Sequence, residues 1–450
     1  MGSIAPARPS YLQAAEEAAR WIRSTARPTE HGLVWLPDPD QPDLKATITS
    51  PATLYSGNAG IVLFLLELAN ATGSPAYLDD AKQGGDQIAA TWREIEQFQG
   101  FLTLENALLD FQFGLSGTGW LLGQLWLAIG ETRYRDASHD IFQYIASKAK
   151  PAGSGVAWIG SPTVGLGDGL IILTLLWAAE TLDDPLFREL AIKGGQRFLE
   201  TPEPDGLGGI RWRNPFLSQF GAPEGAYAPN FELGTAGTAF VLARLYQETN
   251  EQAFLDAAIA GVEHLKSIAT LEDDAALIYY RSPDFTDLYY LGYCHGPVGT
   301  SRPFYLLHEI TGDDRYLEWV ERLARGVIRS GVPEMQTPGL WNVVCQCCGT
   351  AGIADFFTGL ALVTNNEEYL TFAERVAAVT LSRESDFDGQ GPRWYQAWTR
   401  TRPDAVNAET GYMIGAAGVG ASFLHLALAQ DGRYQALLFP DNPYPRSQPA

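Results

Sequence analysis

The sequence predicts an all-α protein, a closed (α/α) toroid (double barrel) of seven helical hairpins. Three observations support this architecture. A Gly-x-small-Gly turn recurs seven times along the 450 residues, a strongly apolar segment follows each copy, and an amphipathic segment precedes each copy. Its second glycines are 52 to 68 residues apart, a spacing typical of proteins that build their core by stacking similar helical units.

The glycine turns mark the starts of the predicted inner helices. The third copy, Val164–Gly169, is degenerate because its first glycine has slipped. Segments such as Ile61–Asn70 are apolar on every side, and a helix of this kind must be buried on all sides. We expect crowded backbones at these turns and, at some of them, a positive φ. The second glycines are Gly60, Gly117, Gly169, Gly237, Gly299, Gly352 and Gly418.

The predicted outer helices are amphipathic and begin on an aromatic residue after a polar turn. Charged residues recur at helical spacing, as in Glu318, Arg322 and Arg325, which indicates a solvent-exposed face. Turn signals such as Asp183-Asp184-Pro185 separate one hairpin from the next. The predicted segments are Tyr11–Ser24, Tyr77–Trp92, Tyr134–Lys148, Phe187–Leu199, Phe254–Ile268, Tyr316–Ile328 and Tyr369–Leu381.

A closed ring is favoured over an open solenoid. The terminal repeats of a solenoid should be polar and atypical, whereas the first and last repeats here resemble the others. In a closed ring the long segments between outer and inner helices, such as Arg27–Ala52 and Glu200–Asn230, lie at one end. Loops of this length usually form binding surfaces, so the functional site is expected at that end.

Composition and charge limit the possible partners. Hydrophobic residues make up 46% of the chain, enough for a single domain over 1–450 in which only the N-terminal ~10 and C-terminal ~15 residues are irregular. The net charge of −22 disfavours nucleic acid and anionic membranes. The apolar stretches are too short to span a bilayer, and the start of the chain lacks a signal-peptide layout. We expect a soluble, cytoplasmic monomer.

The cysteines indicate a metal or catalytic site, because three of the four fall within four residues instead of forming a disulfide pattern. Cys294 and His295 precede the fifth glycine turn, and Cys347 and Cys348 precede the sixth. Adjacent repeats of a toroid bring these turns together. Zinc binds thiolates, and a catalytic site leaves one position open. A closed four-cysteine site that includes Cys345, or plain buried thiols, are the alternatives.

These motifs resemble those of the lanthionine synthetase C-like family. Tyr293–Gly299 is similar to its first zinc motif, and Cys347–Gly352 is similar to the second, in the Cys-Cys-Gly form of one subgroup. The resemblance extends from about Tyr11 to Gln430. It implies addition of a zinc-activated thiolate to the β-carbon of a dehydroalanine or dehydrobutyrine, with protonation completing the thioether. It also implies Zn²⁺ bound by Cys294, Cys347 and Cys348.

The sequence departs from the family at two positions. Leu233 stands where the family carries an acid/base histidine, and Tyr290 stands where it carries an arginine. His295 is the first candidate for proton transfer, followed by Glu232, and Asp110 is a further candidate. As alternatives, His295 is a packing residue and Asp110 is an acid at a helix N-terminus.

The leading hypothesis is a zinc-dependent, lanthionine-synthetase-like cyclase that forms thioethers in a peptide. The alternatives are binding or transfer of glutathione or another small thiol, and a zinc-bearing peptide-binding scaffold without turnover. A toroidal glycosidase would need paired carboxylates across the cavity. The acidic pairs Asp79-Asp80, Asp183-Asp184 and Asp313-Asp314 instead lie in turns at the outer helices. A peptide or a small thiol is therefore the expected substrate.

Overall fold

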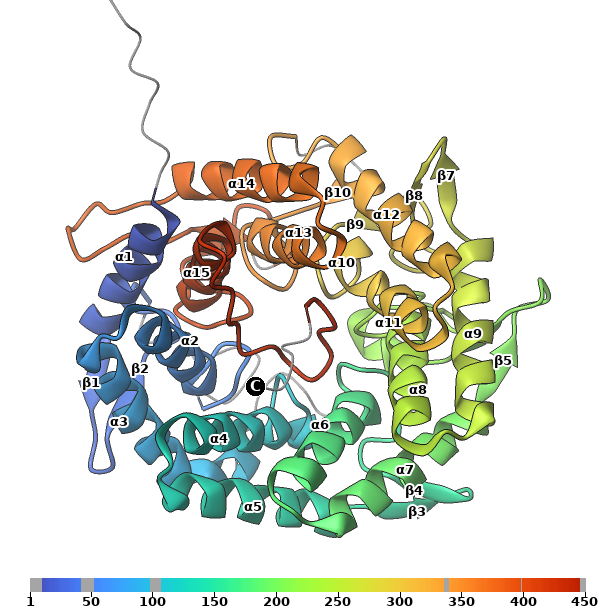
Figure 1. The fold of residues 1–450 in the computed structure, drawn as a ribbon, viewed down its shortest axis with the longest axis horizontal. Helices are drawn as coiled ribbons and strands as arrows, with labels where there is room; N and C mark the ends of the chain where they lie inside the picture. Colours follow the sequence, from blue (N-terminus) through green and yellow to red (C-terminus); the bar gives the residue numbers. More distant parts are fainter. Residues whose placement is uncertain (1–9, 42–51, 98–106, 336–339, 398, 446–450) are drawn as a thin grey trace, which may run out of the picture.

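The computed structural model describes residues 10–41, 52–97, 107–335, 340–397 and 399–445. Within these ranges, helices form two concentric rings around one axis (Figure 1). Several predicted segments lie outside the described residues. These are the irregular N-terminal segment apart from residue 10, the last five residues of the irregular C-terminal segment, and much of the 27–52 loop. That the whole chain is one domain stays a prediction.

The inner ring consists of the apolar helices that follow the glycine turns. Its fifth member is divided at Ser301, and Pro303 follows in the first turn of the second piece, where its missing N–H does no harm. The inner helices are α2 (Asn58–Thr72), α4 (Leu115–Ile129), α6 (Asp168–Thr181), α8 (Thr235–Thr249), α10 (Pro297–Thr300) with α11 (Arg302–Thr311), α13 (Thr350–Thr364) and α15 (Ala416–Gln430).

The outer ring consists of the amphipathic helices and coincides closely with the seven predicted segments. Each outer helix buries one face against the inner ring; α1, for example, buries Ala15, Ala18 and Ile22. The outer helices are α1 (Tyr11–Ser24), α3 (Pro75–Thr91), α5 (Thr132–Ser147), α7 (Pro185–Leu199), α9 (Gln252–Ser267), α12 (Asp314–Arg329) and α14 (Glu367–Ser382).

The sequence suggested hairpins made of an outer helix and the inner helix that follows it. In the structure the main helix pairs are different. Each inner helix packs mainly against the outer helix that follows it, as α2 does against α3, because a short turn at Gly73 joins them. The helix α1 packs against α15 and so completes the last pair. Since α15 also contacts α2, the inner ring is closed, and the predicted closed toroid is confirmed.

The glycine turns are crowded as expected, and the expected positive φ occurs in the third turn, where Leu166 has a φ of 49°. The first glycines have extended backbones, for example φ −150° at Gly234. A Cβ atom on Gly237 would lie 2.0 Å from the carbonyl oxygen of Phe231, and one on Gly117 would lie 2.0 Å from that of Phe111. Glycine is therefore required at these turns because the backbone approaches itself too closely for any side chain.

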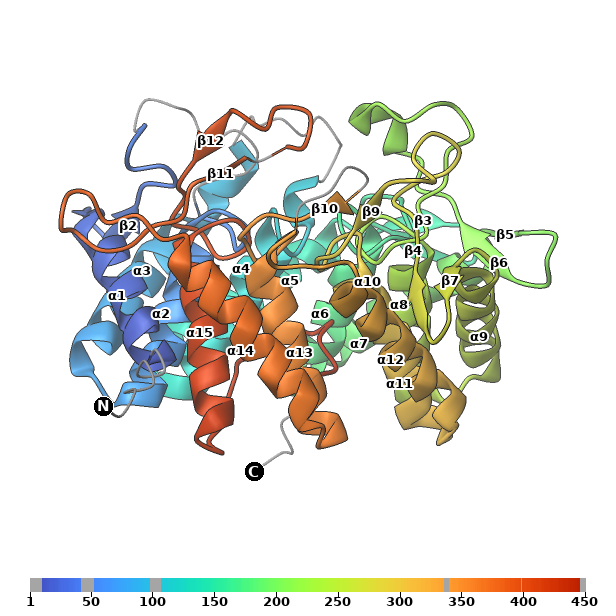
Figure 2. The same cartoon turned by 90° about the horizontal axis from the view of Figure 1, so that it is seen from above.

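Short strands form in the long loops at one end of the toroid (Figure 2), a feature that the sequence analysis did not predict. Among the described residues, five antiparallel pairs each follow an outer helix, and a sixth pair is parallel. The antiparallel pairs are β1 (Ala26–Pro28) with β2 (Leu33–Trp35), β3 (Lys150–Ala152) with β4 (Gly155–Ala157), β5 (Pro202–Pro204) with β6 (Ile210–Trp212), β7 (Thr270–Glu272) with β8 (Ala275–Leu277), and β11 (Gln396–Ala397) with β12 (Val406–Asn407). The parallel pair is β9 (Tyr289–Tyr290) with β10 (Leu340–Trp341). Three short 3-10 helices, η1 (Trp92–Gln97), η2 (Ala107–Leu109) and η3 (Leu217–Phe220), also belong to the loops.

Tryptophan side chains fix three of these loops to the outer helices. The indole N–H groups of Trp158, Trp212 and Trp394 each donate a 2.9 Å hydrogen bond to a backbone carbonyl in the last turns of α5, α7 and α14. These bonds satisfy carbonyl groups that a helix leaves unpaired at its C-terminal end. Repeated anchoring of this kind gives the loop end of the toroid a fixed shape.

In the part of the chain that the structure describes, no helix has both the length and the apolar composition required to cross a bilayer.

Candidate functional site: a thiol cluster on the floor of a cavity

A belt of backbone hydrogen bonds brings the seven repeats into register. It runs through the residue two positions before the glycine that directly precedes each inner helix. Six of the seven neighbouring pairs are joined directly by an N–H to C=O bond of 2.7 to 3.2 Å. The belt residues are Tyr55, Gln112, Gly165, Glu232, Cys294, Cys347 and Met413. Positions of the same repeat phase are therefore bonded neighbours, which is why residues far apart in sequence meet here.

In six of the seven repeats, the next residue forms the floor of a cavity at the loop end of the toroid. The cavity has a volume of about 420 Å³. The floor residues at its base are Phe113, Leu166, Leu233, His295, Cys348 and Ile414. Leu233 and His295 thus occupy equivalent positions in neighbouring repeats. Among the floor residues, His295 and Cys348 are the polar ones.

The three predicted thiol ligands converge in this cavity. The Sγ atom of Cys348 lies 3.1 Å from that of Cys294 and 3.6 Å from that of Cys347, and all three lie within 4.8 Å of one another. The N–H of Cys294 donates a 3.2 Å bond to the carbonyl of Cys347, which is the belt bond between repeats five and six. All four cysteines are free thiols, and Cys345 is not part of the cluster.

The cluster fits one zinc ion in donor chemistry and in size. Thiolates around a tetrahedral zinc, bound at about 2.3 Å, stand about 3.8 Å apart, close to the observed separations. Cys294 and Cys347 are buried, whereas Cys348 is half-buried and faces the cavity. Burial raises the pKa of Cys294, whereas hydrogen bonds from Cys294 and Cys347 lower the pKa of Cys348 to about 7. All three cysteines line the cavity.

His295 and Glu232 lie beside the cluster. A ring nitrogen of His295, a carboxylate oxygen of Glu232 and the Sγ atom of Cys294 all lie within 4.8 Å of one another. Burial, with a smaller contribution from the charge of Arg281, lowers the pKa of His295 to about 3. Burial and the neighbouring Cys347 raise the pKa of Glu232 well above its usual range. Burial therefore disfavours the charged form of both side chains next to the thiols.

Asp110, the third predicted catalytic residue, lies outside the residues that line the cavity. Its buried carboxylate accepts backbone N–H bonds from Gln112 at 2.7 Å, Phe113 at 3.0 Å and Leu166 at 2.9 Å. Burial raises its pKa to about 6, although these hydrogen bonds oppose the rise. Asp110 thereby links Gln112 to Leu166, the residue after Gly165, where the belt neighbours Gln112 and Gly165 have no direct bond. Its catalytic role stays a prediction.

The walls of the cavity contain residues that the sequence analysis missed. Tyr280 stacks on Tyr290 at 4.6 Å between ring centroids, and both rings meet His295 edge-on. Arg281 and Arg400 add positive charge to the wall, although Arg281 is also bonded to Asp284. The repeat phase would have identified Tyr55, but no repeat signal marks the loop residues Tyr280, Arg281 and Arg400.

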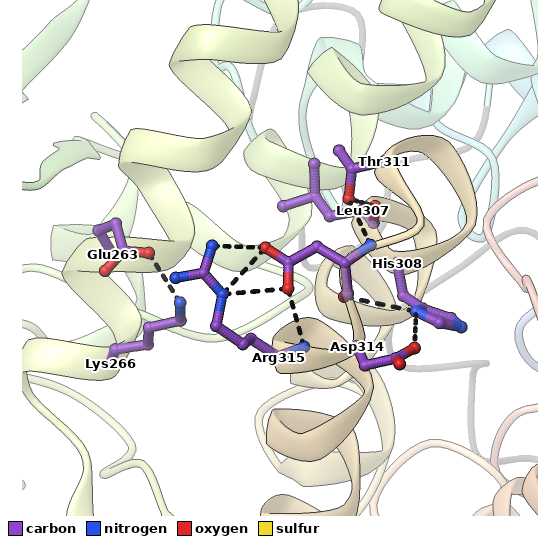
Figure 3. A network of polar contacts seen from close by, with 8 residues as sticks. Glu263, Lys266, Leu307, His308, Thr311, Asp314 and Arg315 are labelled. Carbon is purple, nitrogen blue, oxygen red and sulfur yellow. Dashed lines mark hydrogen bonds and ion pairs between the residues drawn. The ribbon is translucent and has the colours of Figure 1, made fainter.

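The acidic pairs considered for a glycosidase lie at the outer helices, away from this cavity. Figure 3 shows the surroundings of Asp314: the carboxylate of Asp313 caps α12 through the N–H of Arg315 at 3.0 Å and also bonds the Arg315 guanidinium. The side chain of Asp314 is 92% exposed. Asp184 likewise caps α7 through Leu186, and Asp80 pairs with Arg23. These carboxylates stabilise helices and surface contacts.

Comparisons with known proteins agree with the cysteine motifs and with the toroid. Residues 234–439, which contain both motifs, match the family described as "Lanthionine synthetase C-like protein". The solved structure of "Nisin cyclase" is similar over 93% of each chain, with a TM-score of 0.61 and 16% identity. A GH76 α-mannanase of Bacteroides thetaiotaomicron aligns over 95% of this chain and 97% of its own with a TM-score of 0.49 and 14% identity. No curated protein matches the chain.

At these identities the structural likeness establishes the fold, while the family match covers the part of the chain that supplies the thiols. The family match is limited to residues 234–439, and the structural likeness to nisin cyclase is one of fold.

Proposed function

We propose that this chain is a zinc-dependent enzyme that forms thioethers by adding a peptide cysteine to a dehydroamino acid of the same peptide. One observation carries the proposal: three thiols converge on the floor of a cavity, and His295 and Glu232 lie beside them. The family match over 234–439 and the fold shared with nisin cyclase support it.

Cys294, Cys347 and Cys348 would hold the zinc ion, which would lower the pKa of a substrate thiol. In the addition, the sulfur forms a bond to the β-carbon of the alkene, the C=C π bond breaks, and the α-carbon takes up a proton. We assign removal of the thiol proton to the neutral ring of His295 and delivery of a proton to the α-carbon to Glu232. The aromatic wall of Tyr280 and Tyr290 would exclude water and orient the peptide.

The arginines of the cavity wall favour a second candidate, addition of a small acidic thiol of the glutathione class to a dehydrated residue. Two guanidinium groups, Arg281 and Arg400, line a cavity in a chain with a net charge of −22. Guanidinium groups recognise carboxylates. The same thiol chemistry would then act between two molecules. A zinc-bearing scaffold without turnover remains an alternative within the family resemblance. The cytoplasmic location remains a prediction from the cysteine usage.

The test is incubation of the zinc-loaded protein with dehydrated, cysteine-containing peptides, followed by thiol alkylation and mass spectrometry. We expect peptide cysteines to become protected from alkylation without a change in peptide mass, and the Cys347→Ala variant to leave them reactive. Addition of glutathione mass to the peptide would instead support the second candidate. Fully alkylatable peptides with no added thiol, across a panel of precursors, would support the scaffold.

A further inference from the structure

The chain downstream of α15 fills the centre of the toroid. Residues 437–444, here called the axial plug, run into the middle of the inner ring (Figure 1, dark red). The N–H of Leu437 donates a 2.7 Å bond to Glu67 of α2. Phe439 packs edge-on against Phe111 and Trp120, with ring centroids 5.3 and 5.5 Å away. A small cavity of about 50 Å³ lies between the plug and the inner ring.

The plug carries a buried carboxylate aimed at the residue before the first zinc cysteine. Asp441 is 1% exposed, and its Oδ2 atom accepts a 2.7 Å hydrogen bond from the hydroxyl of Tyr293. The same Oδ2 atom lies 2.8 Å from the guanidinium of Arg302. The side-chain amide of the belt residue Gln112 donates a 3.0 Å bond to the Tyr293 hydroxyl. Tyr293 is therefore held from two sides, by the plug and by the belt.

These contacts are connected to the thiol cluster because the residues involved are neighbours of Cys294 and Glu232 in the sequence. Tyr293 directly precedes Cys294, whose backbone N–H is bonded to Cys347. The guanidinium of Arg302 lies over the rings of Tyr293, at 4.6 Å, and Phe231, at 5.1 Å. Phe231 directly precedes Glu232. One ion pair between the plug and α11 thus fixes the side chains next to both a thiol and the proposed acid.

The need to fill the centre of the inner ring does not explain why position 441 carries a carboxylate. Burying a carboxylate costs several kcal/mol unless paired, and apolar side chains of similar volume often fill such a position at no loss of stability. Phe439 and Tyr444 already supply apolar filling on either side of it. The bond from Asp441 to the Tyr293 hydroxyl instead specifies a position for the chain at Cys294.

We propose that Asp441 of the axial plug is a positioning residue for the thiol cluster: through Tyr293 it holds Cys294 where it can share a metal ion with Cys347 and Cys348. This inference rests on the proposed zinc site. It makes the C-terminal segment, which has no helix or strand, part of the metal centre. Residues that support metal ligands commonly change metal affinity by about 10- to 100-fold when they are replaced.

The test compares Tyr293→Phe, Asp441→Asn and the double variant in the full-length protein. Tyr293→Phe removes one hydroxyl and keeps the Asp441–Arg302 pair, so it stays informative even if Asp441→Asn does not fold. Tyr444→Phe is the matched control, because it removes a 3.0 Å bond from the plug hydroxyl to Ser301 without touching Tyr293. Zinc affinity is measured by chelator competition, and site geometry by the charge-transfer absorption of the Co²⁺-substituted protein.

We expect Tyr293→Phe and Asp441→Asn each to weaken zinc binding about tenfold and to alter the Co²⁺ spectrum, with no further loss in the double variant. The control should lower the melting temperature without changing zinc affinity. Unchanged zinc affinity in Tyr293→Phe, or an equal loss in Tyr444→Phe, would overturn the positioning role. If the wild-type protein itself binds no zinc, the proposed function fails; if it binds zinc and the variants match it, only this inference fails.

Discussion

At the scale of single residues, the proposed metal site depends on which cysteine side chains can bind the same ion. Cys294, Cys347 and Cys348 converge from two adjacent turns, whereas the buried Cys345 lies two residues before Cys347 and its N–H is bonded to Gln396. The sequence identified these three thiols because Cys294 and Cys347 share one repeat phase and Cys348 directly follows Cys347. The sequence could not decide between a catalytic role and a packing role for His295. The surroundings of His295 depend on Tyr280 and Tyr290, which belong to loops without a repeat pattern.

The four cysteines should differ in their effect on metal content. Replacing Cys294, Cys347 or Cys348 by Ala removes one of three thiolate ligands, so we expect zinc below stoichiometric amounts in each purified variant. Cys345→Ala is the matched control and should keep one zinc per chain. Elemental analysis after dialysis against a weak chelator decides between them. Loss of zinc from Cys345→Ala would indicate the closed four-cysteine site instead.

The proposed acid and base should be separable from metal binding. We expect Glu232→Gln and His295→Asn to lower the rate of thioether formation by about 100- to 10,000-fold, because each removes a proton-transfer group. Both variants should retain zinc, since neither is one of the three thiol ligands. Single-turnover assays with a dehydrated peptide give the rates. A variant that retains zinc and full activity would remove that residue from the mechanism.

At the scale of elements, the glycine turns and the belt position the site. Crowding at the turns was predictable, because the Gly-x-x-Gly pattern is visible seven times, and the structure confirms it at Gly117 and Gly237. The β-hairpins were not predictable from periodicity, because strands of two or three residues are too short to show an alternating pattern. The axial plug was expected to be irregular, and it has no helix or strand, but its burial depends on tertiary contacts alone.

Asp110 should matter for stability because it completes the belt. Asp110→Ala leaves the buried N–H groups of Gln112 and Leu166 without an acceptor, and each costs about 1 to 3 kcal/mol. We therefore expect a loss of about 3 kcal/mol in the free energy of unfolding, measured by denaturant titration. Asp314→Ala is the surface control and should change it by less than about 0.5 kcal/mol. Equal stability of the two variants would contradict the structural role of Asp110.

At the scale of the whole molecule, closure of the ring joins the first and last repeats. The sequence predicted closure from the similarity of the terminal repeats, and the contacts of α15 with α1 and α2 confirm it. A buried histidine lies at this seam: His425 of α15 is 2.7 Å from a carboxylate oxygen of Asp355 and 3.1 Å from one of Glu67. Composition and spacing gave no indication of this cluster, because its members come from three different inner helices.

The seam should make stability depend on pH. Although burial opposes the charge, Asp355 and Glu67 raise the pKa of His425 well above its ordinary value. A raised folded-state pKa stabilises the fold fully below the unfolded-state pKa, near 6.5, and this contribution is lost as the pH rises through the folded-state value. We expect His425→Gln to cost about 3 kcal/mol between about pH 5 and 6.5, and less at higher pH.

Denaturant titrations of the wild type and the variant across this pH range give the difference directly. The exposed His31, in the turn between β1 and β2, provides the control, and His31→Gln should show no such trend. A cost of His425→Gln that grows as the pH rises above about 6.5 would contradict the charged state assigned to the cluster.

The most direct test of the account is X-ray absorption at the zinc edge of the purified protein. The account predicts one zinc per chain with three sulfur neighbours at about 2.3 Å and one oxygen or nitrogen neighbour at about 2.0 Å, the position left open toward the cavity. Four sulfur neighbours would show a closed structural site that includes Cys345. Absence of zinc, or a shell dominated by oxygen and nitrogen, would contradict the thiolate centre itself.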